Sequence, residues 1–564
     1  MSESLGSAAP ARSNVRAVGL LALLAWLLNL YFYTGYYASD DMDYLKGVQR
    51  LADLQPIDAN DIAQMRLMVT APAAFVYRLF GSITLTILSY TLYHPLLVVI
   101  AYRLGRLAFN PKAALLGAAI VALSPVYYVY GGAILPDNCL SLWLAVLLLA
   151  AVWTLDQARS GQLSRTRELA YWLAVGGATG LAYSAKEPGI VAAVPVSIGI
   201  LCLRLQAGAR WGALQAAVAY GLGVVGFVVL ETLLLHALSG SWVVRLLSGV
   251  GSEESMVALR ERMELQGVLP LARLRFWYSR SNAYLGWALW VVLLANLAAW
   301  PLLRSRGAQP NERRHVPLLL AFWLWLFSYL SFGTTNFSAY LPPPLQHPRY
   351  FSVCVLPAAV IAAAAVWRLT ELLSERLVER TRLRRLVRFV PAALLAVWGV
   401  ARFLHFEPDA GDIYRAAQTK AALAAFEDAR RLYPKRPVVL SSYLARRLAP
   451  LLQGRGCSGC GRIITKVDSM EELPARPFVG LIATKQYRDT FGPLLTSLER
   501  SRQIKVEPIG FGTYRAPHGR RSELAAALYP LLGEFSEPKW PVAEPRLAVH
   551  LYLVSDGPAA AAAP

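Results

Sequence analysis

Three aspartates follow the first long apolar run of the chain, in the sequence SDDMDYL that contains Asp40, Asp41 and Asp43. A carboxylate held near other acids and away from water binds its proton more tightly, which suits a general base acting on an acceptor hydroxyl or amine. The competing interpretation is that Asp41 or Asp43 caps the following helix. We expect Asp40 to be the base and one of the other two to be a cap.

Cationic side chains precede two later apolar runs, Lys186 in AKEPG and Arg349 in QHPRYF. Either cation could neutralise a phosphate close to the low-dielectric membrane boundary, and a guanidinium can bind phosphate oxygens bidentately. Two alternatives stay open: Lys186 pairs locally with Glu187, or Arg349 extends to the interface beside an aromatic belt. His347 and Tyr350 flank Arg349 and are expected to contact substrate.

Two further acids lie where apolar helices are expected. Asp137 in LPDNCL precedes an apolar run, where it either caps the helix or contributes to the same site as Asp40. Glu231 in ETLLLH lies within an apolar run, and intramembrane carboxylates usually face a cavity or a partner. We therefore expect Glu231 to line the substrate site.

The composition indicates the environment in which these residues act. The chain has 564 residues, of which 56% are hydrophobic and 16% charged, so a soluble globular protein is excluded in favour of a membrane protein. The net charge of +20 comes mainly from short Arg-rich patches between apolar segments. Such patches orient helices in a membrane, so we expect no nucleic-acid binding.

The apolar runs predict an α-helical polytopic membrane protein with about eleven transmembrane helices. The basic loops between them alternate, which places the N-terminus in the cytoplasm and the C-terminus outside. The expected helices lie near residues 16–34, 82–102, 112–130, 138–156, 169–185, 189–205, 211–236, 282–303, 316–333, 350–368 and 389–405.

Two domains follow from this pattern, a membrane domain over residues 1–405 and a soluble outer domain over residues 406–564. Four stretches of the outer domain read as strands, RPVVL, PFVGLIA, IKVEPIGFGTYRA and LAVHLYLVS, and the first two are followed by helical patterns. The expected class is α/β. Cys457 and Cys460, in CSGC, are spaced for a local disulfide in an oxidising compartment, and whether they form one stays open.

The order of these motifs resembles the C-type glycosyltransferase (GT-C) superfamily. SDDMDY, LPD, AKEPG, ETLLLHALSG and HPRY occur in the order seen in its family 39, which includes protein O-mannosyltransferases and bacterial lipid A aminoarabinose transferases. The likeness covers about residues 15–405. It implies an inverting transferase in the bacterial inner membrane that uses a polyprenyl (undecaprenyl) phosphate sugar at its periplasmic face.

The resemblance also implies roles for individual residues. An acidic pair in the first outer loop is catalytic in the family; here Asp40 matches its Asp and Asp41 stands in its Glu position. The family's further motifs are matched by Tyr44, Asp137, Lys186, Arg349 and Tyr350.

The chain departs from the family in two respects. The Lys-Pro-Pro stretch that holds the lipid phosphate in the aminoarabinose transferases is absent, and Arg66 or Arg78 is expected to replace it. The luminal β-trefoil insert of the protein mannosyltransferases is also absent, which favours a lipid or cell-envelope glycan over a protein as acceptor.

The sequence leaves several points open. GFGTYR lacks the remainder of a dinucleotide fingerprint, so no organic cofactor is expected, whereas a divalent metal bridging the acids is neither required nor excluded. Two other functions remain: a glycan polymerase or ligase with pyrophosphate-linked donors, or a lipid-sugar flippase, which would place polar residues on both sides of the membrane midplane.

Overall fold

The structure of the protein is a computed structural model. It describes residues 8–32, 40–206, 210–242, 245, 288–304, 310–333, 348–376, 381–405, 426, 431, 438–440, 478–483, 504–513 and 548–556. The chain divides into two compact units. The first contains Met1–Tyr33, Leu54–Ala73 and Ile87–Phe406, and the second contains Thr34–Asp53, Ala74–Thr86 and Glu407–Pro564.

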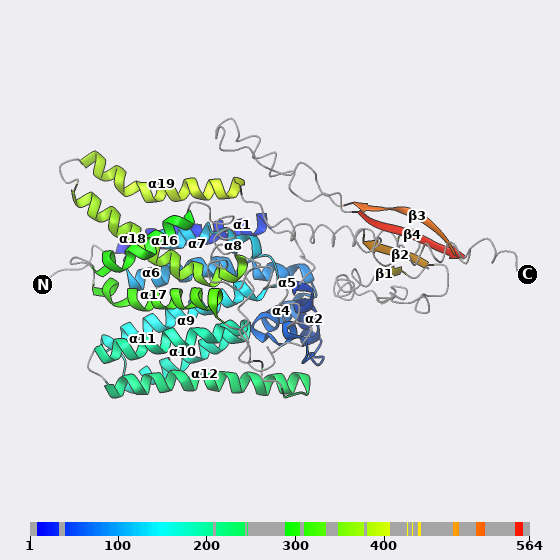
Figure 1. The fold of residues 1–564 in the computed structure, drawn as a ribbon, viewed down its shortest axis with the longest axis horizontal. Coiled ribbons are helices and arrows are strands. Elements are labelled where there is room, and N and C mark those ends of the chain that lie inside the picture. The colour runs from blue at the N-terminus through cyan, green and yellow to red at the C-terminus, as the bar shows by residue number, and fades with distance from the viewer. Residues whose placement is uncertain are drawn as a thin grey trace, which may run out of the picture. The chain divides into compact units, whose positions relative to one another are not determined.

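The first unit is a bundle in which long helices such as α9, α10, α12 and α18 run side by side (Figure 1). Short 3-10 turns link or precede some of these helices. The described elements of this unit are α1 (Ala8–Tyr31), α3 (Ile62–Met65), α6 (Tyr93–Ala108), α7 (Pro111–Ala122), α8 (Pro125–Tyr130), α9 (Pro136–Arg159), α10 (Arg165–Ala185), η1 (Glu187–Ala192), α11 (Ala193–Gln206), α12 (Arg210–Ser239), α16 (Ala288–Arg304), α17 (Pro310–Phe332), η2 (Pro348–Phe351), α18 (Ser352–Arg376) and α19 (Thr381–His405).

Among the described residues, six helical segments are long and apolar enough to cross a bilayer. Five shorter apolar helices accompany them. One of these five, α4 (Leu67–Phe80), is not among the predicted spans. The predicted count of about eleven spans therefore stays a prediction, although described helices lie at each predicted range.

Proline and local turns divide two of the predicted helices. The range 82–102 is covered by α5 (Ile83–Tyr90) and α6, and the range 112–130 by α7 and α8. Pro125 is the first residue of α8, where its missing N–H leaves no helical hydrogen bond unmade, and Ser124 before it is extended.

The core of the bundle lies around α9 and α18. About 72% of the α9 span and 78% of the α18 span is buried, compared with 28% of the α12 span, so α12 lies at the periphery. The sequence of α18 is rich in alanine (AAVIAAAAV), which lets α7 and α16 approach it closely.

The second unit contains α2 (Asp40–Ala52) and a four-stranded sheet of order β1-β2-β4-β3. β1 (Val438–Leu440) and β2 (Phe478–Ala483) are parallel, whereas β4 (Ala548–Asp556) pairs antiparallel with β2 and with β3 (Ile504–Thr513).

All four strands of this sheet lie in the stretches expected to form strands. The predicted helices, Cys457 and Cys460 lie outside the described residues, so the α/β class and the domain boundary at residue 406 stay predictions.

Candidate functional site

The candidate site lies where α9 begins, α10 ends and α18 begins. Asp137 is in the first turn of α9, after Pro136, and Lys186 directly follows α10, which packs against α9. The chain then turns sharply at η1. A side chain at Gly189 would overlap the Ala182 carbonyl group, so glycine allows the turn to fold back against the last turns of α10.

Two cations share the Asp137 carboxylate. Lys186 Nζ donates a hydrogen bond of 2.6 Å to Asp137 Oδ1, and Arg349 Nε lies 3.4 Å from Asp137 Oδ2. Lys186 Nζ also lies 4.1 Å from the centre of the Tyr350 ring, within the range of a cation–π contact. Asp137, Lys186 and Arg349 form a first cluster, in which one carboxylate contacts two cations.

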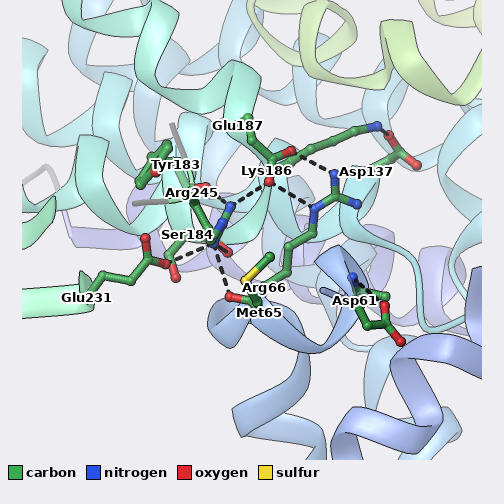
Figure 2. Close-up of polar contacts among 11 residues, drawn as sticks. Asp61, Met65, Arg66, Asp137, Tyr183, Ser184, Lys186, Glu187, Glu231 and Arg245 are labelled. Carbon is green, nitrogen blue, oxygen red and sulfur yellow. Dashed lines mark hydrogen bonds and ion pairs between the residues drawn. The ribbon is translucent and has the colours of Figure 1, made fainter. Parts of the chain in front are cut away.

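A second cluster, Arg66, Glu187, Glu231 and Arg245, lies beside the first (Figure 2). Arg66 binds both oxygens of Glu187, with Nη2 to Oε2 at 2.7 Å and Nε to Oε1 at 3.3 Å. Arg245 binds Glu231 at 2.9 Å and Glu187 at 2.8 Å. These four side chains contribute two charges of each sign, so they balance one another.

A small pocket lies beside the first cluster. Its polar wall contains Asp137, Lys186, Tyr329 and Tyr350. The apolar wall is formed by Leu140, Leu144, Pro188, Leu326, Leu330 and Val353. The lining of this pocket therefore combines charged and phenolic groups with aliphatic side chains.

The structure brings together four residues that were selected from sequence, Asp137, Lys186, Arg349 and Tyr350. The ion pair expected as an alternative for Lys186, with Glu187, is replaced by the pair with Asp137, and Glu187 binds two arginines instead.

Two other predicted residues, Arg66 and Glu231, belong to the second cluster. The structure shows Glu231 paired with Arg245, and lining of the substrate site by Glu231 stays a prediction.

The predicted acids of the first outer loop lie in α2, in the second unit. Asp40 is the first residue of this helix, and Asp41 and Tyr44 are buried. Asp43 forms a pair of 2.8 Å with Lys46, one turn ahead on the helix. That Asp40 and Asp41 share a site with Asp137 stays a prediction, and His347 lies outside the described residues.

Sequence reasoning missed Arg245 and the bridging position of Glu187. Arg245 occurs in SWVVRLLSG, on the side of the membrane assigned to the outside. A cation there runs against the positive-inside bias, which is the same signal that singled out Arg349. The same outer loop, residues 237–281, contains five further arginines, so that signal alone does not single out Arg245.

A metal site was left open by the sequence. Among the described residues, no group of three or more His, Cys, Asp or Glu side chains is arranged to hold a metal ion.

Comparisons with known proteins agree with the motif analysis. Residues 67–236 match the model of the family described as dolichyl-phosphate-mannose-protein mannosyltransferase. No curated protein sequence matches significantly.

Solved structures similar to this chain include an oligosaccharyltransferase from Archaeoglobus fulgidus tethered to an acceptor peptide. It is 11% identical with a TM-score of 0.51, and the match covers 88% of this chain and 69% of that one. Archaeal oligosaccharyltransferase AglB from the same organism, in complex with an inhibitory peptide and a dolichol-phosphate, is 13% identical with a TM-score of 0.48. That match covers 79% of this chain, but this chain spans only 64% of AglB.

A third structure, ArnT from Cupriavidus metallidurans bound to undecaprenyl phosphate, is 16% identical with a TM-score of 0.45, covering 87% of this chain and 95% of ArnT. The predicted resemblance to the C-type glycosyltransferases is confirmed by the family-model match together with the fold shared with the oligosaccharyltransferase.

Proposed function

We propose that the chain is an inverting glycosyltransferase of the bacterial inner membrane. It moves a sugar from undecaprenyl phosphate or a similar polyprenyl phosphate to a lipid or cell-envelope glycan at the periplasmic face. The observation that carries this proposal is the convergence of Lys186 and Arg349 on one carboxylate at the polar end of an apolar pocket.

The charge of the first cluster supports phosphate as the ligand. Lys186 and Arg349 are both held against the Asp137 carboxylate, so an anionic group that binds beside Asp137 would meet two fixed cations. Fixed cations in a site of low dielectric stabilise the charge that develops on a leaving group. Lys186 and Arg349 therefore hold the departing phosphate, and Arg66 assists them from the neighbouring cluster.

The apolar wall of the pocket supports a polyprenyl carrier rather than a soluble nucleotide sugar. Leucine, valine and proline side chains suit a branched hydrocarbon, and they lie directly beside Lys186 and Tyr350. The description of the matched family model, a transferase that uses a dolichyl phosphate sugar, agrees with this interpretation.

The reaction is a single displacement at the anomeric carbon. The acceptor oxygen or nitrogen forms the new bond, the bond from the anomeric carbon to the phosphate oxygen breaks, and the phosphate leaves with the electron pair. Asp40 accepts the acceptor's proton, assisted by Asp41. Asp137 orients the two cations, while Tyr44, Glu231, His347 and Tyr350 contact the sugar or the acceptor.

Identification of the released lipid tests this function. The purified protein in nanodiscs is incubated with an envelope lipid extract as acceptor, and with sugars carried on either undecaprenyl monophosphate or undecaprenyl pyrophosphate. We expect wild-type protein to release undecaprenyl phosphate from the monophosphate donors, as detected by mass spectrometry, and Lys186→Met to release far less.

Two outcomes would contradict the proposal. Consumption of only the pyrophosphate donors would indicate a polymerase or ligase. Movement of intact donor across a sealed vesicle without release of lipid phosphate would indicate a flippase.

A further inference from the structure

We propose that Arg245 is a positioning residue, which holds Arg66 and Lys186 in the places where they meet the donor phosphate. The identity of the ligand rests on the proposed function, whereas the positioning of the two cations rests on the contacts of Arg245 alone.

One guanidinium joins three stretches of the chain, around Met65, residues 183–187 and Glu231 (Figure 2). Arg245 donates hydrogen bonds to the backbone oxygens of Met65 at 3.3 Å, Tyr183 at 2.8 Å and Ser184 at 3.0 Å. It also binds Glu231 of α12 and Glu187 of η1. The Tyr183 ring lies 4.9 Å from its guanidinium carbon, which adds a cation–π contact.

The three backbone contacts are made next to the proposed phosphate-binding cations. Met65 is the last residue of α3 and Arg66 follows it directly. Tyr183 and Ser184 lie in the last turn of α10, and Lys186 directly follows this helix. The last carbonyl groups of a helix have no partner within that helix and carry partial negative charge, so a guanidinium binds them well. Arg245 thereby fixes the two helix ends from which Arg66 and Lys186 project.

A second link runs through Glu187. Its Oε1 atom accepts from Arg245 at 2.8 Å and from Arg66 at 3.3 Å, so one carboxylate connects the two guanidinium groups. Arg245 therefore acts on Arg66 in two ways, through the backbone of the preceding residue, Met65, and through Glu187 at the Arg66 guanidinium group.

Exposure separates the positioning cation from the cations that meet the ligand. The Arg245 side chain is 0% exposed and contacts two carboxylates, whereas Arg66 and Lys186 remain 13% and 15% exposed. A lysine at residue 245 would supply three donors from a single nitrogen and could not span the same acceptors, so even this conservative change should release the helix ends.

The test uses the full-length protein in nanodiscs and two variants of Arg245. Arg245→Lys keeps the charge. Arg245→Met combined with Glu231→Gln removes the Arg245 charge together with one of its two carboxylate partners, which limits the cost of leaving an unpaired buried charge. The control is Arg314→Met, because Arg314 likewise pairs with a carboxylate, that of Asp156, which lies at the end of α9 opposite to Asp137.

Two measurements are made on each variant that keeps a wild-type thermal unfolding transition. The first is the rate of reductive methylation of Lys186, followed by mass spectrometry, with Lys112 as the internal standard. The second is the affinity for undecaprenyl phosphate. We expect both Arg245 variants to raise the Lys186 rate severalfold and to lower the affinity about tenfold, as expected for the loss of a charged hydrogen bond.

Unchanged Lys186 reactivity in folded Arg245→Lys protein overturns the inference. Wild-type Lys186 reactivity and wild-type affinity in the Arg245→Met, Glu231→Gln variant would also overturn the inference. Neutralising the charge of Glu231 would then be the whole role of Arg245. If wild-type protein does not bind undecaprenyl phosphate, the proposed donor is wrong, while the Lys186 rate still decides whether Arg245 positions that residue.

Discussion

At the scale of single residues, Asp137 shows how one side chain can satisfy two interpretations at once. Its place in the first turn of α9 is that of an ordinary helix-start acid, which the helix dipole favours. The same carboxylate also contacts Lys186 and Arg349, which come from segments far away in sequence. Local pattern can predict the first role only, since the second depends on how α9, α10 and α18 pack.

Asp40 and Asp43 provide a matched pair for testing the proposed base. Both lie in the first turn of α2, and Asp43 pairs with Lys46 on a partly exposed surface. Asp40→Asn should lower the rate of sugar transfer by about 10²-fold or more, the usual contribution of a general base. Asp43→Asn should leave the rate within about twofold, because exposed ion pairs contribute little.

The measurement is turnover in membranes at matched expression, at saturating donor. Equal turnover of Asp40→Asn and wild-type protein would remove Asp40 from the base role and leave Asp41 as the next candidate.

At the scale of elements, α10, the helix that Lys186 follows, packs closely against α12. Gly176 and Gly223 face each other across this contact. A Cβ atom at Gly176 would overlap the Tyr220 carbonyl oxygen and would lie 2.9 Å from the Gly223 Cα atom. Small residues permit such close approach of helices in membranes.

Two neighbouring glycines in α10 test this packing. Gly176→Ala should lower the free energy of unfolding by about 1–3 kcal/mol, because the added methyl group meets backbone that cannot rotate away. Gly177→Ala meets no heavy atom within 4 Å and should be neutral or slightly stabilising, since alanine favours helices. Unfolding in mixed detergent micelles measures both, and equal destabilisation by the two variants would refute the proposed contact.

The sequence predicts individual elements better than it predicts their contacts. The length of the apolar runs predicted five helices correctly, namely α9, α10, α12, α17 and α18. It can do so because an apolar run that crosses lipid must satisfy its backbone hydrogen bonds within its own helix. It missed α3, which is short and is stabilised by tertiary contacts such as the hydrogen bond from Arg245 to the Met65 carbonyl oxygen. The positive-inside bias singled out Arg349, and the interruption of an apolar stretch singled out Lys186. Nothing local to Arg245 indicates that it would bind the ends of two other helices.

At the scale of the whole molecule, apolar spans and a cationic cluster beside an apolar pocket suit a reaction on a lipid carrier. A charged phosphate at a membrane boundary must be met by fixed cations, and its hydrocarbon chain must stay in an apolar environment. The central claim is that Lys186 and Arg349 provide those cations.

The affinity for undecaprenyl phosphate, compared with that for uncharged undecaprenol, tests this claim most directly. It is measured with wild-type protein and with Lys186→Met, Arg349→Met and the control Arg314→Met. We predict that wild-type protein prefers the phosphate, that Lys186→Met and Arg349→Met each weaken phosphate binding about tenfold, and that Arg314→Met does not. Equal affinity of all four proteins for the phosphate, or no preference of wild-type protein over undecaprenol, would contradict the account.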